Sequence, residues 1–127
     1  MYNALIRTHH ITSRKKISKL TAAASHHNIY ALLRYGGAPG IMYCQGRHEA
    51  GVKGWIADVK RLRYKDFQLV RKPGLKEGDG DGEGKGEVVR YGRLEEVESV
   101  KEFGARMEGL GVWEWWRAGM GFVGEKG

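Results

Sequence analysis

Apolar residues along the chain alternate between strand-like runs and helical stripes. The β-branched and apolar stretch 5–12 predicts a first strand. A helix is predicted from Arg14 to about His27, with Ser13 as its N-cap. Its apolar side chains follow helical spacing at Ile17, Leu20, Ala23 and Ala24.

Two apolar runs follow, at 29–35 and 41–45, separated by the Gly/Pro-rich stretch 36–40. They predict two strands joined by a hairpin-like turn. Pro39 belongs in the turn, because proline cannot donate a hydrogen bond to a sheet. A longer first helix that reaches Arg34 is the alternative interpretation.

A second amphipathic helix is predicted after Gly46, with an apolar stripe at Val52, Trp55, Ile56, Val59 and Leu62. The stretch 64–72 predicts a fourth strand, which Pro73 and Gly74 end. The order strand, helix, strand, strand, helix, strand is the split βαβ arrangement of the ferredoxin-like fold. The predicted fold class is therefore α+β, an antiparallel sheet with two helices on one face and a C-terminal strand and helix extension.

The C-terminal part extends this unit. Residues 76–87 alternate glycine with charge and contain no large apolar residue, which predicts a flexible loop. A short strand or hairpin is expected over 88–97, and a helical extension over 99–122. Ser99 and Glu102 have the spacing of a capping box at the start of that extension.

The last helical turns are rich in tryptophan. Trp113 and Trp116 are three residues apart and can share one helix face. We expect this segment to pack across the sheet as core. The alternative is an exposed patch, Trp113–Trp116, that docks a partner protein.

Length and composition fit one domain, 1–127, with one core. No stretch approaches the roughly 20 apolar residues that span a bilayer, so no membrane contact is expected. The single Cys44 excludes an internal disulfide framework. These features predict a reducing compartment, the nucleus or the cytoplasm.

Charge is distributed unevenly along the chain. Residues 1–75 contain 14 Lys and Arg against 3 Asp and Glu, whereas residues 76–127 contain 8 against 12. A basic region of this strength commonly meets a polyanion, which suggests nucleic acid.

Several short motifs resemble one family. The first is residues 9–11, which precede a predicted helix start rich in Lys and Arg. The second is residues 37–41, which lead into a predicted strand that ends at Gly46. The third is the stretch from Trp55 to Lys65, which contains Leu62-Arg63-Tyr64 near its end. Together they resemble the C-terminal domain of pre-mRNA-processing factor 3, a ferredoxin-like module that also follows RWD domains. The resemblance implies contact with small nuclear RNA in a ribonucleoprotein. For the RWD-associated branch it implies no activity.

The predicted function is a non-catalytic RNA-binding or ribonucleoprotein-associated module, with a single-stranded or small nuclear RNA as partner. Lys and Arg would hold phosphates, and an aromatic ring would stack on an unpaired base. The candidate RNA-binding residues are His9, His10, Arg14, Lys15, Lys16, Lys19, Arg34, Tyr35, Arg63, Lys65, Arg71 and Lys72. The alternative is a protein–protein interaction module of the RWD-associated type with no RNA role.

Patterns that would indicate catalysis or a metal are incomplete. His10-Ile11-Thr12 is a lone His-x-Thr motif, whereas two-histidine phosphoesterases need two. The five histidines and one cysteine lack the paired spacing of a zinc site. The stretch 79–84 imitates a calcium loop, but Arg90 stands where the bidentate Glu is required. We therefore expect no enzyme activity, no cofactor and no metal.

Overall fold

Nine elements make up the structure, a computed structural model that describes residues 1–77 and 88–122. In chain order they are β1 (Tyr2–Thr8), α1 (Arg14–His27), β2 (Tyr30–Arg34), β3 (Gly40–Gly46), α2 (Glu49–Arg61), β4 (Gln68–Leu75), β5 (Arg93–Val97), α3 (Val100–Gly109) and α4 (Trp113–Met120). None of the helices in the described residues is long and apolar enough to cross a membrane.

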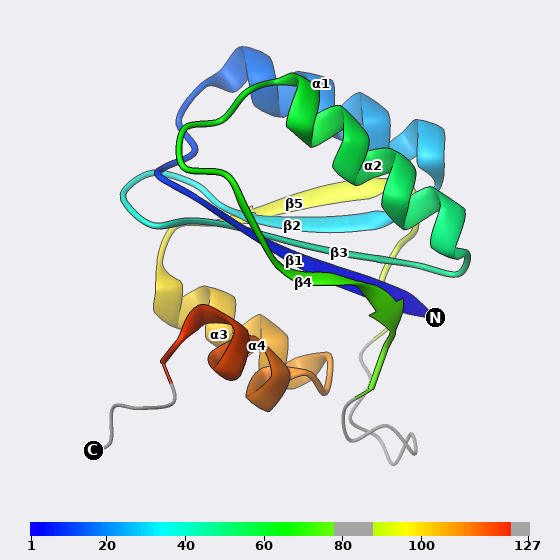
Figure 1. Cartoon of the computed structure of the whole chain (residues 1–127), viewed down its shortest axis with the longest axis vertical. Helices are drawn as coiled ribbons and strands as arrows, with labels where there is room; N and C mark the ends of the chain where they lie inside the picture. Colours follow the sequence, from blue (N-terminus) through cyan, green and yellow to red (C-terminus); the bar gives the residue numbers. More distant parts are fainter. Residues whose placement is uncertain (78–87, 123–127) are drawn as a thin grey trace.

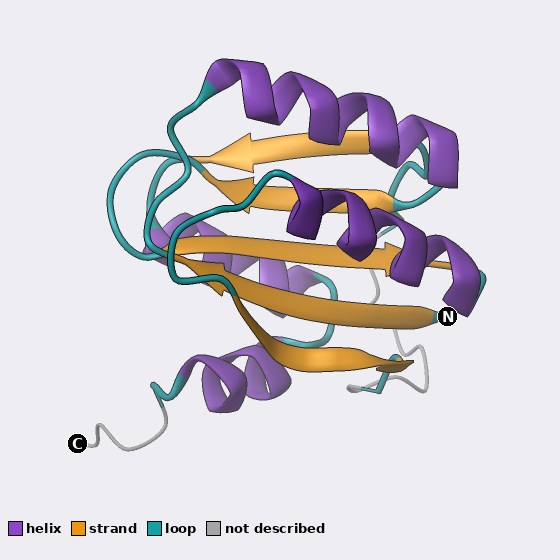
Figure 2. Cartoon of the chain, turned by 45° about the horizontal axis from the view of Figure 1, so that its top comes forward, coloured by secondary structure: helices purple, strands orange, loops and turns teal. Residues whose placement is uncertain are grey.

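The strands form one sheet in the order β4-β1-β3-β2-β5. Helices α1 and α2 cover one face, and α3 and α4 lie on the opposite side (Figures 1 and 2). The first six elements follow the split βαβ order, which confirms the predicted α+β, ferredoxin-like fold class.

Three strand details differ from the sequence expectations. β5 pairs with β2 in parallel, so the sheet is not wholly antiparallel. β4 continues through Pro73, which an edge strand tolerates because its outer N–H positions need no partner in the sheet. β1 ends at Thr8, and Ile11 beyond it makes only an isolated bridge to Gly36.

Both ends of α1 follow from local sequence. The Ser13 hydroxyl accepts a hydrogen bond from the Lys16 N–H at 3.2 Å, which confirms the predicted N-cap. Asn28 ends the helix in the left-handed conformation at φ 54°, a conformation that asparagine adopts more readily than most residues. The alternative of a helix running to Arg34 is therefore wrong.

The core has two parts, one on each face of the sheet. The first lies under α1 and α2, where Leu20, Trp55 and Val59 are fully buried. Trp55 also donates a hydrogen bond from its indole N–H to the Leu20 carbonyl at 3.1 Å. The second lies under α3 and α4, where Phe103 and Trp116 pack against the sheet.

Residues 99–122 were expected to form a helical extension, and they contain the two helices α3 and α4. The capping box is present, with the Glu102 N–H donating to the Ser99 hydroxyl at 3.0 Å and the Ser99 N–H donating to the Glu102 carboxylate at 3.2 Å. The predicted flexible loop over 76–87 falls outside the described residues except for 76 and 77.

The second core predicts unequal roles for two tryptophans of α4. Trp116 is 4% exposed and its ring stacks on Phe103 at 5.9 Å, whereas Trp113 is 37% exposed. We expect Trp116→Ala to lower the free energy of unfolding by about 3–5 kcal/mol, because it empties a packed site. Trp113→Ala on the same helix is the control and should cost about 1 kcal/mol or less. Urea unfolding followed by circular dichroism measures both, and equal losses would contradict this assignment of the core.

Candidate functional site

The antiparallel arrangement of α1 and α2 brings the first turns of α1 beside the last turn of α2 (Figure 1). The connection between α2 and β4 also lies at this end. Lys16 of α1 reaches over it, with its ammonium 4.7 Å from the centre of the Tyr64 ring. Burial raises the pKa of Tyr64 to about 12, so the ring remains neutral beside this cation.

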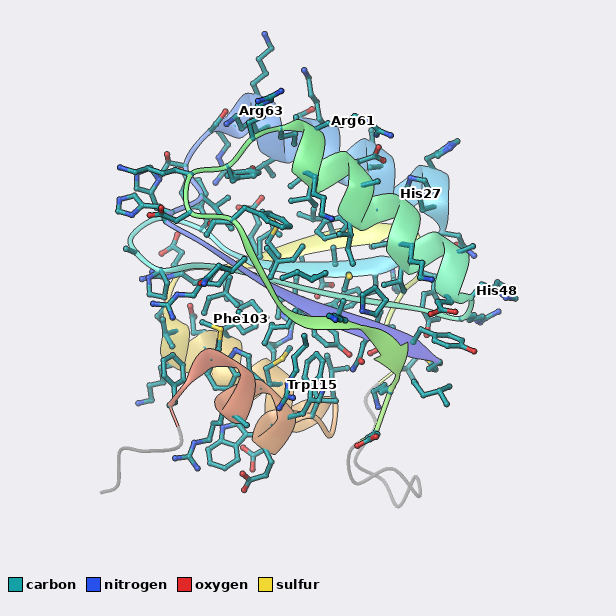
Figure 3. All side chains as sticks on the ribbon, in the orientation of Figure 1. His27, His48, Arg61, Arg63, Phe103 and Trp115 are labelled. Carbon is teal, nitrogen blue, oxygen red and sulfur yellow. The ribbon has the colours of Figure 1, made fainter. Side chains whose placement is uncertain are left out.

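Positive charge concentrates at this end. The stretches 14–19 and 58–66 contain eight Lys and Arg against two Asp. We call the eight cationic residues the basic end: Arg14, Lys15, Lys16, Lys19, Lys60, Arg61, Arg63 and Lys65. Figure 3 shows Arg61 and Arg63 on the outer side of the helical layer, away from the sheet.

Both acidic residues of these stretches already have partners. The carboxylate of Asp58 lies 2.8 Å from Nε2 of His27 and also pairs with Arg61. Asp66 lies 3.6 Å from Nδ1 of His9. For Lys15, Lys19 and Arg63, the structure shows no ion pair within the described residues. These three cations are available to an outside partner.

A groove of about 330 Å³ lies between α1 and α2 at the basic end. Leu20, Ala23 and Leu62 give it apolar walls, and Lys19 and Arg61 stand on its sides together with Asp58. An apolar channel with cationic sides suits a ligand that carries both an apolar side chain and negative charge.

Four of the predicted RNA-binding residues have structural partners instead. Arg34 donates to the carbonyls of Gly37, Pro39 and Glu98 at 2.6, 3.1 and 3.0 Å. Arg71 donates to the carbonyl of Trp115 at 3.0 and 3.2 Å. Arg14 lies 3.9 Å over the ring of Tyr35 and pairs with Glu96 at 2.9 Å, which raises the pKa of its guanidinium. The Tyr35 ring is therefore covered by a cation and is not a free stacking surface.

The remaining predicted residues do not form one surface. Lys15, Lys16, Lys19, Arg63 and Lys65 belong to the basic end. His9 and His10 lie just after β1 with their rings 4.7 Å apart, and Lys72 lies exposed on the edge strand β4.

The sheet offers no open aromatic face within the described residues. Tyr30 and Tyr43 are at most 1% exposed and belong to the second core. Burial raises the pKa of both phenols. In Figure 3, Phe103 and Trp115 lie on the α3 and α4 side of the molecule, and the Trp115 ring meets Tyr43 edge-on at 5.8 Å.

A second polar cluster joins the sheet to α3. The Tyr30 hydroxyl donates to Glu95 at 2.8 Å, and Arg106 donates to the same hydroxyl at 2.6 Å and also pairs with Glu95. Partial burial alone would raise the pKa of Glu95, but the hydrogen bonds from Tyr30 and Arg106 outweigh it and lower that pKa. This cluster links three elements, β2, β5 and α3, and the charge of Glu95 is matched by that of Arg106.

The described residues contain no group of three or more His, Cys, Asp or Glu side chains placed to hold a metal ion. Cys44 is a free, fully buried thiol, and burial raises its pKa to about 12. A thiol with so high a pKa is a poor nucleophile at neutral pH.

The sequence analysis included Lys19, which lines the groove, and His9, which lines a second depression near β1, but it missed the other lining residues. Leu62 was assigned only to the apolar stripe of α2, yet it lines the groove. Arg7 and Gln68 are paired across β1 and β4 and line a cleft. Arg7 does interrupt an apolar run, which is a signal that the sequence carries.

No family model matches this chain, and no curated protein matches it. A solved structure described as a bacterial light-regulated adenylyl cyclase is similar, with a TM-score of 0.45 and 9% sequence identity. The alignment covers 93% of this chain and 35% of that one, so this chain spans about a third of that protein's length. The likeness is too low to transfer an activity. The resemblance to the pre-mRNA-processing factor 3 domain stays a prediction.

The predicted function is corrected on these findings. The comparison with known proteins gives no support to an RNA-binding or ribonucleoprotein-associated module. The same comparison gives no support to the alternative module of the RWD-associated type. The structure itself argues against RNA binding at the predicted residues. Tyr30 and Tyr43 are buried, and Arg14 covers the ring of Tyr35. Arg34 and Arg71 bind backbone carbonyls of the chain itself.

Arg34 provides a test of its structural role. We expect Arg34→Ala to lower the free energy of unfolding by about 1–3 kcal/mol, because three carbonyls lose a charged donor. Arg93→Ala removes an exposed arginine for which the structure shows no partner within the described residues, and it should change stability by about 0.5 kcal/mol or less. Urea unfolding compares the two, and an Arg34→Ala loss as small as the control would exclude the structural role.

Proposed function

We propose that this domain is a non-catalytic docking module whose basic end binds an acidic segment of a partner protein. The observation that supports the proposal is the concentration of cations at the basic end, where Lys19 and Arg61 line the groove and Lys15, Lys19 and Arg63 have no ion pair within the described residues. Charge of one sign beside an apolar channel favours a partner of opposite charge that also brings an apolar anchor.

The distribution of charge in the remainder of the domain supports a directional contact. Helices α3 and α4 on the opposite side contain three Glu against three Lys and Arg, so that side has no net charge. A partner with negative charge is therefore attracted to one side of the molecule and not to the other.

The predicted docking segment Trp113–Trp116 is a weaker candidate. Trp116 is buried, and Trp115 is partly buried against Tyr43. Trp113 remains 37% exposed, with Arg117 4.6 Å from its ring centre. One exposed ring is a small contact surface compared with the basic end.

A nuclear or cytoplasmic location belongs to the same proposal. The free Cys44 thiol supports a reducing compartment, because such compartments keep thiols reduced.

The test is fluorescence anisotropy with a labelled amphipathic peptide that carries Glu on one helical face and Leu on the other. We expect the triple variant Lys15→Glu, Lys19→Glu, Arg63→Glu to weaken binding at least about tenfold, because each change replaces attraction by repulsion. Added salt should weaken binding of the unchanged protein, since these side chains are exposed to solvent.

The control is Lys72→Glu, Lys101→Glu, Arg93→Glu, three exposed cations away from the groove. It changes net charge by the same amount and should alter affinity by less than about threefold. Equal weakening in both triple variants would show a response to net charge alone and refute the site. Absence of binding at low salt by the folded, unchanged protein would refute the docking function.

A further inference from the structure

A cleft of about 620 Å³ lies at one end of the sheet. The connections from β1 to α1, from β2 to β3 and from α2 to β4 meet at this end (Figure 1). The cleft shares no lining residue with the groove between α1 and α2, so the inference drawn from it is independent of the proposed docking function.

The walls of the cleft are held by hydrogen bonds between the connections. The His9 N–H donates to the Lys65 carbonyl at 2.9 Å, and the Gly40 N–H donates to the His9 carbonyl at 3.1 Å. Arg34 holds the turn from the other side through the Pro39 carbonyl at 3.1 Å. A cleft with walls fixed in this way needs little reorganisation to accept a ligand.

Two polar side chains in the cleft are neighbours on adjacent strands. Arg7 of β1 and Gln68 of β4 are register partners, so their side chains leave the same face of the sheet close together. Both residues are exposed, and the structure shows no ion pair for Arg7 within the described residues. A guanidinium beside an amide offers several N–H donors to one carboxylate.

The rest of the lining adds an apolar part and limits the charge. Ala38 and Pro39 contribute apolar surface, whereas the ring of Phe67 is partly buried against the first core, on the face of the sheet opposite to Arg7 and Gln68. Asp66 also lines the cleft, held at φ 58° and 3.6 Å from Nδ1 of His9. The negative charge of Asp66 repels a ligand of high charge density such as phosphate. A ligand with one negative charge on a flat apolar body therefore fits the cleft better.

We infer that this cleft is a binding site for a small, flat organic carboxylate. Arg7 and Gln68 receive the carboxylate, and Ala38 and Pro39 contact the apolar body. No chemical step is involved.

The test uses three probes at equal ionic strength: benzoate, its neutral analogue benzamide, and inorganic phosphate. Each is titrated into the ¹⁵N-labelled chain of 127 residues, and amide chemical shifts are followed. We expect saturable shifts with benzoate at His9, Phe67 and Gln68, and smaller, non-saturating shifts with the other two probes. Phosphate shifts as large as those of benzoate would reduce the site to a general anion contact and overturn the inference. Benzamide shifts as large as those of benzoate would also overturn the inference, because they would show that the site makes only an apolar contact.

Two variants separate the site from general effects. Arg7→Gln and Gln68→Ala each change an exposed side chain, and each should weaken benzoate binding at least about fivefold. Arg93→Gln removes one positive charge at a residue outside the cleft and should leave benzoate binding unchanged. Unaltered binding in both cleft variants, with the fold intact by circular dichroism, would overturn the assignment.

Discussion

Burial of the central strands on both faces is the constraint on which this structure depends. Successive residues of β1, β2 and β3 are fully buried in pairs, such as Leu5 and Ile6 or Leu32 and Leu33. Because neighbouring side chains of a strand point to opposite faces, each pair requires an apolar cover on both sides of the sheet. Helices α1 and α2 cover one side, and α3 and α4 must cover the other.

That constraint also decides where a partner can bind. With both faces covered, the aromatic rings of the sheet serve as core, and Tyr43 bonds only within the domain, to Asn3 and Gln45 among the described residues. The exposed features that remain are the outer sides of the helices, the two edge strands and the ends of the sheet. The groove at the basic end and the cleft near Arg7 both belong to this set.

Much of the fold could be predicted because its signals are local. Helical spacing located α1 and α2, and Ser13, Asn28 and Ser99 marked helix ends through hydrogen bonds to residues a few positions away. The pairing of β5 with β2 could not be predicted in the same way. Residues 30 and 93 lie 63 positions apart, and nothing in a five-residue strand shows which neighbour it joins or in which direction.

The candidate site was predictable only in part, for the same reason. The cations of α1 lie on its polar side, opposite to the predicted apolar positions, because helical spacing decides their direction. The roles of Arg34 and Arg71 depend on carbonyls at Gly37, Glu98 and Trp115, which only the tertiary structure brings close. A carbonyl has no sequence signature, since every residue has one.

Helices α1 and α2 carry a net positive charge and helices α3 and α4 carry none, so the molecule has an electrical polarity. Salt screens electrostatic interactions beyond about 8–10 Å in physiological salt. A charged partner within this distance exerts an electrostatic torque on the domain even before the two form hydrogen bonds. The domain then rotates toward the partner before any side chain makes contact, and fewer random collisions are lost to wrong orientations.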